Sequence, residues 1–87
     1  MDNIRVRIEE MLDELKKERD EIHVKLHLAK MDVGDEWDEL GIKLARLEDR
    51  ARELGGATAE SSRDIGAAAK MLAEEIRDGF RSIAKHF

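Results

Sequence analysis

The 87-residue chain contains no cysteine and no proline, and its only aromatic residues are one tryptophan and two phenylalanines. Without cysteine there is no disulfide framework and no thiol nucleophile. No run of about 18 apolar residues occurs, so the sequence predicts no membrane-spanning helix. The N-terminal segment MDNIRVRIEEML also lacks the apolar core of a secretion signal. We therefore expect a soluble, cytoplasmic protein.

A basic surface is missing as well. The chain carries 16 basic and 21 acidic residues, a net charge of -5, and its lysines and arginines are not gathered into a run. Binding to phosphate backbones requires such a basic stripe, so we expect no nucleic-acid partner. No motif combines a nucleophile with a base in a pocket, and the sequence therefore predicts a protein that is not an enzyme and needs no cofactor.

The chain is instead rich in helix-forming residues. Alanine, glutamate, lysine, leucine and arginine make up slightly over half of it, a composition typical of long helices and coiled coils. From Ile4 to Leu54, apolar residues recur every three or four positions, with Arg19 taking one place in the series, which is one face of a helix. Acid and base pairs at i and i+4, such as Glu39 with Lys43 and Glu48 with Arg52, favour the same helix. The sequence predicts an all-α fold with a first helix over about 2–54.

The small and polar segment GGATAESS, residues 55–62, is the predicted turn. Thr58, Ser61 or Ser62 can cap a second helix over about 59–86. The two helices would form one antiparallel helical hairpin, a single domain of residues 1–87. The apolar stripe predicted on the second helix consists of Ile65, Ala69, Leu72, Ile76, Phe80, Ile83 and Phe87.

Gly34 lies inside the predicted first helix, where glycine costs about 1 kcal/mol relative to alanine. The segment MDVGDEW around it could be a break, with Asp32 or Asp35 capping a new helix. The apolar stripe nevertheless continues in phase through Trp37, which we expect in the core rather than as a platform for a ligand. We therefore predict a continuous helix, and the alternative is a monomeric three-helix bundle broken near Gly34.

Helix length predicts self-association. At 1.5 Å per residue the two helices would be about 80 Å and about 40 Å long, so the second would leave half of the first uncovered. An apolar stripe of that length is unusual on a monomer. We expect an antiparallel homodimer that forms a coiled-coil-like bundle, although an unidentified protein could cover the same stripe. The predicted self-association residues are Ile4, Ile8, Leu12, Leu15, Ile22, Val24, Leu26 and Leu28.

His23 and His27 in the stretch HVKLH are the candidate metal ligands. Four residues apart on a helix, and joined by the same pair from a second chain, they would offer up to four imidazoles to a zinc-like ion. Lys16 and Lys30 nearby disfavour a cation. The alternative is that both histidines are polar residues at the shoulder of a bundle.

The segments HLAKMDVGDEWDEL and DIGAAAKMLAEEIRDGFRSIAK resemble a loose group of small bacterial coiled-coil hairpin proteins, some described as stress-associated or apolipoprotein-like. The resemblance covers roughly residues 27–85, implies a helical hairpin and brings no catalytic residues. We predict a non-enzymatic, self-associating interaction or scaffold protein. The alternatives are the metal-binding bundle and a membrane-surface stress-response protein, but a membrane would compete with packing for the stripe of the second helix.

Overall fold

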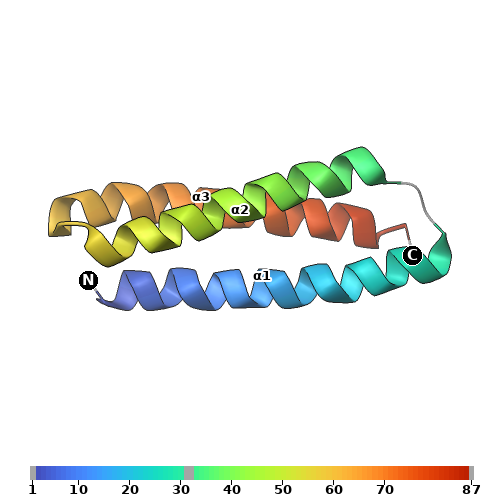
Figure 1. Cartoon of the computed structure of the whole chain (residues 1–87), viewed down its shortest axis with the longest axis horizontal. Coiled ribbons are helices and arrows are strands. Elements are labelled where there is room, and N and C mark those ends of the chain that lie inside the picture. The colour runs from blue at the N-terminus through green and yellow to red at the C-terminus, as the bar shows by residue number, and fades with distance from the viewer. Residues whose placement is uncertain (1, 31–32, 87) are drawn as a thin grey trace.

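The computed structural model describes residues 2–30 and 33–86, and all regular structure in these ranges is helical. Three helices follow one another along the chain: α1 (Asp2–Ala29), α2 (Gly34–Gly56) and α3 (Ala59–Ala84). The chain runs along α1, returns along α2 and runs forward again along α3 (Figure 1). The N-terminal ends of α1 and α3 therefore lie at the same end of the bundle. The prediction of an all-α fold is confirmed.

The predicted continuous helix over about 2–54 is wrong, because the chain reverses between α1 and α2. Lys30, directly after α1, has a left-handed φ of 54°, the conformation in which many helices end. The longest dimension of the protein is 46 Å, far short of the extended helix. Reversal near Gly34 costs a few helical hydrogen bonds, but it brings the rest of the chain over the apolar stripe of α1, which outweighs that cost.

The start of α2 differs from the start expected at a break. Val33 occupies the N-cap position, where its carbonyl accepts a hydrogen bond from the backbone N–H of Trp37 at 2.9 Å. Asp35 lies in the first turn of α2, where its charge favours the positive end of the helix dipole. Asp32, the other residue considered as a cap, lies outside the described residues.

The turn between the last two helices lies within the predicted segment 55–62, but it is confined to residues 57–58, and Thr58 is the cap of α3. Its hydroxyl accepts a hydrogen bond from the backbone N–H of Ser61 at 3.2 Å. The hydroxyl of Ser62, which is buried, donates in turn to the carbonyl of Thr58 at 2.8 Å. Thr58 thus accepts hydrogen bonds from both Ser61 and Ser62 in the first turn of α3. Phe87, placed on the predicted stripe, lies outside the described residues.

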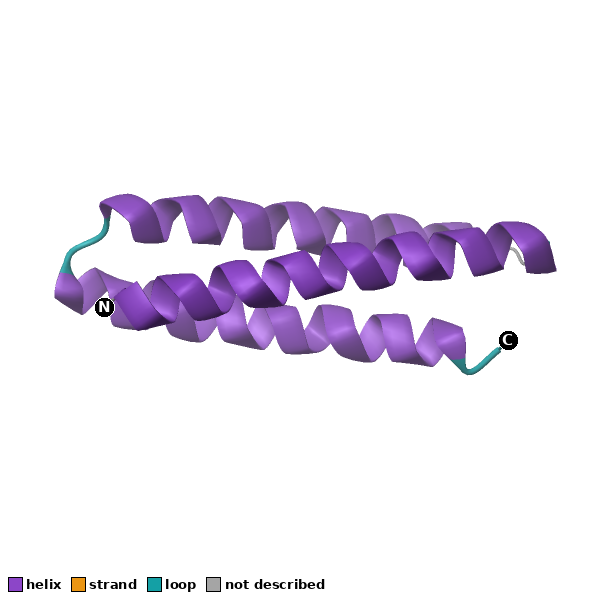
Figure 2. Ribbon diagram, turned by 90° about the horizontal axis from the view of Figure 1, so that it is seen from below, coloured by secondary structure: helices purple, strands orange, loops and turns teal. Residues whose placement is uncertain are grey.

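One hydrophobic core runs along the axis of the bundle, whose three helices lie side by side (Figure 2). The apolar stripe of α1, expected to need a second chain, is covered by α2 and α3 of the same chain. The buried core residues are Ile8, Leu12, Leu15, Ile22 and Leu26 of α1, Leu40, Leu44, Leu47 and Leu54 of α2, and Ala69, Ala73, Ile76, Phe80 and Ile83 of α3.

Two glycines of α3 let its neighbours approach closely. A Cβ added at Gly66 would lie 2.7 Å from Cγ2 of Ile4 in α1, and one added at Gly79 would run into the side chain of Leu40 in α2. A Cβ at either position would force the side chain that it meets to shift. α3 consequently contacts both α1 and α2 more extensively than those two helices contact each other.

Replacing Lys30 with glycine should stabilise the protein. A left-handed φ brings the Cβ of any other residue too close to its own backbone, whereas glycine has no Cβ. We expect the free energy of unfolding to rise by about 0.5–1 kcal/mol in urea denaturation, after the extra freedom of glycine in the unfolded chain is subtracted. Lys25→Gly, inside α1, is the control, and its free energy of unfolding should fall by about 1 kcal/mol. A lower free energy of unfolding in both variants would contradict the left-handed conformation of Lys30.

Alanine should act with opposite sign at two helical glycines. Apart from its chain neighbours and the nearby backbone of α2, no described atom lies within 4 Å of a Cβ added at Gly41, so Gly41→Ala should gain about 1 kcal/mol from helix propensity. At Gly79 the same methyl group must displace the buried side chain of Leu40, at a cost of about 1–3 kcal/mol, which offsets or exceeds that gain. Thermal unfolding measures both variants. An equal gain in both would show that α3 does not approach α2 closely at Gly79.

Candidate functional site

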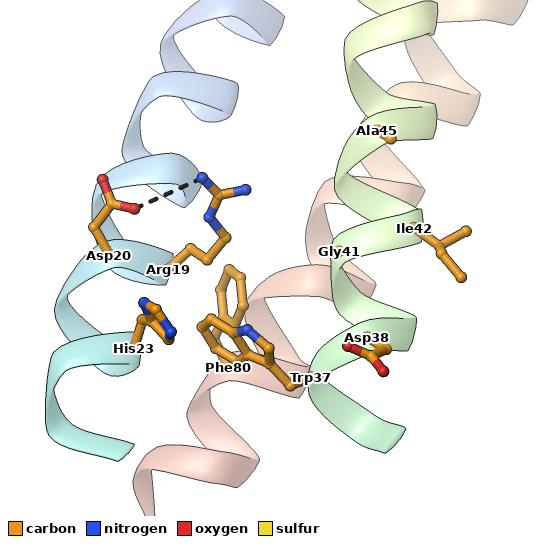
Figure 3. A pocket seen from close by; sticks show the side chains of 9 residues that line it. All are labelled: Arg19, Asp20, His23, Trp37, Asp38, Gly41, Ile42, Ala45 and Phe80. Carbon is orange, nitrogen blue, oxygen red and sulfur yellow. Dashed lines mark ion pairs between the residues drawn. The ribbon is translucent and has the colours of Figure 1, made fainter. Parts of the chain in front are cut away.

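A groove of about 590 Å³ lies between α1 and α2 and reaches down to Phe80 of α3 (Figure 3). α1 and α2 contact each other least among the three pairs of helices, which leaves this seam open. The residues that line the walls are Arg19, Asp20 and His23 of α1 and Trp37, Asp38, Gly41, Ile42 and Ala45 of α2.

Three rings from three different helices meet in this groove. The indole of Trp37 stacks on the imidazole of His23, with ring centroids 5.7 Å apart and ring planes 16° apart. It also meets the ring of Phe80, with centroids 5.8 Å apart and the planes tilted by 43°. Both separations lie in the range in which rings attract each other. Trp37 packs against the core, as predicted, but it is only half-buried and so also forms part of the groove.

An ion pair bridges the same seam farther along the helices. Nζ of Lys16 lies 3.1 Å from Oε1 of Glu48, which joins α1 to α2. Beyond it the seam opens again into a smaller hollow of about 260 Å³ that is lined in part by Arg5 and Gly55. Arg19 and Asp20, on the α1 wall of the larger groove, form an ion pair at 3.7 Å with each other (Figure 3). The rim of the larger groove therefore carries both signs of charge.

The α2 wall of the groove combines a hollow with a projecting side chain. Gly41 and Ala45 are one helical turn apart and contribute almost no side chain to the wall. Ile42, next to Gly41, is 56% exposed, although it is large and apolar. Figure 3 shows Ile42 pointing outward from α2 on the same side as Asp38. An apolar projection thus lies directly beside a space of suitable size for one.

Sequence reasoning did not find this surface. Ile42 falls outside the buried stripe of Leu40, Leu44 and Leu47, and this loss of phase was the available signal. Its neighbours Gly41 and Ala45 are small and cover little of it. The hollow itself depends on how far α1 lies from α2, and the spacing of residues in one helix carries no information about that distance.

Both predicted metal ligands lie on the surface. His23 and His27 are exposed, and the imidazole of His23 is engaged with Trp37. Within residues 2–30 and 33–86, no three histidine, cysteine, aspartate or glutamate side chains converge where they could hold an ion. A site that two chains would share stays a prediction.

The predicted self-association residues divide into two groups. Six of the α1 positions face α2 and α3: Ile4 is half-buried, and Ile8, Leu12, Leu15, Ile22 and Leu26 are buried. Val24 and Leu28 lie on the opposite side of α1, 59% and 75% exposed. Val24 and Leu28 therefore form an exposed apolar side of α1, whereas the other six residues are covered by α2 and α3 of the same chain.

Comparisons with protein-family models, with curated proteins and with solved structures find no match for this chain. The resemblance to small bacterial hairpin proteins therefore stays a prediction. In the described part of the chain, no helix is both long and apolar enough to cross a membrane. The role of the protein has to be inferred from the geometry of its own surface.

His23→Ala should shift the fluorescence emission of Trp37 to longer wavelength, because it uncovers one face of an indole that is already half-exposed to water. The chain has a single tryptophan, so the signal has one source. His27→Ala removes an exposed imidazole from the same helix and should leave the spectrum unchanged. Identical spectra for the two variants would rule out the stacked arrangement.

Proposed function

We propose that the chain is a non-enzymatic interaction module that associates with a second copy of itself through the α1/α2 groove. The observation that carries this proposal is the position of Ile42, an exposed apolar side chain beside the hollow at Gly41 and Ala45. Exposed large apolar side chains beside a shaped hollow are typical of protein interfaces.

The projecting Ile42 and the hollow at Gly41 and Ala45 lie on one face of α2, so this face can pack against a copy of itself. When two α2 helices pack antiparallel about a two-fold axis near Ile42, each Ile42 faces four residues of the other helix at the spacing that receives a knob in helix packing. Those four residues are Asp38, Gly41, Ile42 and Ala45, and all of them line the groove. The contact would also remove part of the half-buried Trp37 from water.

Charge supports the same arrangement. Asp38 and Arg46 lie one turn before and one turn after Ile42, and both side chains are exposed. An antiparallel pair centred on Ile42 therefore sets Asp38 of each copy opposite Arg46 of the other. Unlike charges at mirrored positions favour this register over parallel packing, in which like charges would face each other.

The size of the protein is compatible with such an interface. The bundle measures 46 × 19 × 17 Å, and one side of a body of this size is comparable with the roughly 800 Å² that each partner contributes to a stable complex. This arrangement uses the surface of α2 instead of the stripe of α1 from which the sequence predicted an antiparallel homodimer. The membrane-surface alternative relied on the apolar stripe of α3: Ile76, Phe80 and Ile83 are buried in the core, and Leu72 is half-buried against it.

Sedimentation equilibrium tests the proposal. The average mass of the wild-type protein should rise with concentration toward that of two chains, and Ile42→Lys should weaken association by about tenfold or more, because it places a charge in the centre of the contact. Val6→Lys is the matched control, since Val6 is 48% exposed on the outer face of α1. That variant should associate like the wild type.

An exchange of charges tests the register. Asp38→Arg and Arg46→Asp should each weaken association, and the double variant should restore it, because the unlike pairs across the two-fold axis are then reformed. A single-chain mass at concentrations up to about 1 mM, where an association of about −4 kcal/mol would already be evident, would overturn the proposal. Association that is unaffected by Ile42→Lys would locate the contact elsewhere and reject this surface.

A further inference from the structure

A second kind of groove lies between the parallel helices α1 and α3, near their N-terminal ends, and holds about 260 Å³. Its floor is apolar and includes Ile4 and the buried Ile8, and Ala67 lies on its α3 wall. The charged residues at its rim are all cations, namely Arg7, Arg63 and Lys70. This groove therefore differs from the α1/α2 groove, whose rim carries both signs of charge.

The three cations are available to a ligand. Although the chain has a net charge of -5, Arg7, Arg63 and Lys70 form no ion pair with any residue that the structure describes. Three like charges around one groove repel one another until an anion joins them. The groove lies toward the end of the bundle at which α1 and α3 both begin (Figure 1).

The backbone explains why the groove is narrow. Gly66 lets α3 approach Ile4 of α1 so closely that an added Cβ would lie 2.7 Å from that side chain. Ala67, the next residue, is exposed and too small to fill the space outside this contact. The resulting volume is below the range of about 300–1,000 Å³ that pockets for drug-sized molecules span. A narrow chain fits it better than a helix or a fused ring system.

We propose that this groove binds a single-chain anionic amphiphile of the fatty-acid type. The carboxylate would lie among Arg7, Arg63 and Lys70, and arginine is well suited to it because its guanidinium forms paired hydrogen bonds with a carboxylate. The alkyl chain would lie along Ile4 and Ile8. The proposal is independent of the dimer described above, because it uses the other side of α1.

Isothermal titration of the full chain with laurate, a twelve-carbon fatty acid, below its micelle concentration tests this site. Saturable binding of one laurate per chain is expected. Octanoate should bind at least about tenfold more weakly, because four fewer methylene groups are buried. Dodecyltrimethylammonium, which has the same alkyl length and the opposite charge, should not bind.

Two substitutions distinguish the contribution of the rim charge to laurate binding from that of the shape of the groove. Arg63→Glu should weaken laurate binding by about tenfold or more through loss and reversal of charge, and Lys17→Glu, the same change on the outer face of α1, should not. Ala67→Trp should block the groove without changing any charge. Its matched control is Ala68→Trp, since Ala68 is exposed on the same helix and does not line the groove.

Circular dichroism of each variant confirms that the helices are intact. Equal affinity of laurate for the wild type and for Ala67→Trp would overturn the proposal, as would equal binding of the cationic detergent. If laurate does not bind and Arg63→Glu lowers the average mass in solution, a second copy of the chain occupies the groove. That result would also reject the fatty-acid site. The laurate titration and the effect of Ile42→Lys on the average mass test different surfaces. Either proposal can therefore fail while the other holds.

Discussion

The apolar stripe of α1 has to be covered by the remainder of a chain of 87 residues, and this requirement governs the architecture. The left-handed backbone at Lys30 ends α1 and allows α2 to return along it. α3 then completes the cover. Because the chain reverses twice, α1 and α3 run parallel, and two positive helix ends meet at one end of the bundle. Both grooves follow from this order of helices.

α3 is the element on which the other two helices pack most closely. Gly66 allows close contact with α1 and Gly79 allows close contact with α2, and α3 contacts both helices more extensively than they contact each other. Three helices that are drawn together unequally leave the third side open, and the α1/α2 seam is that side. Trp37 covers part of it by stacking on His23 and meeting Phe80. The candidate interaction surface is therefore a consequence of close packing elsewhere.

Ion pairs decide which charges remain available on the surface. Lys16 pairs with Glu48 across the α1/α2 seam, and Lys43 pairs with Glu75 of α3 at 3.6 Å. Exposed pairs of this kind contribute little to stability, so their main effect is on the distribution of charge. The charged residues at the rim of the α1/α3 groove are all cations, whereas Ile42 has acids on one side along α2 and bases on the other. The two surfaces consequently suit different partners: an anion in the first case and a copy of the same chain in the second.

The sequence alone determined the helical content, the turn before α3 and nearly every core position, because these depend on residues that are neighbours along the chain. It did not determine what covers the stripe of α1, since a period of three to four residues records which side of a helix is buried and not which helix buries it. Glu48 and Lys43, spaced for partners within α2, reach across to other helices instead. Only the tertiary structure decided these contacts, together with the stacking of His23 on Trp37 and the hollow beside Ile42, because each depends on the distance between helices that the reversal after α1 sets.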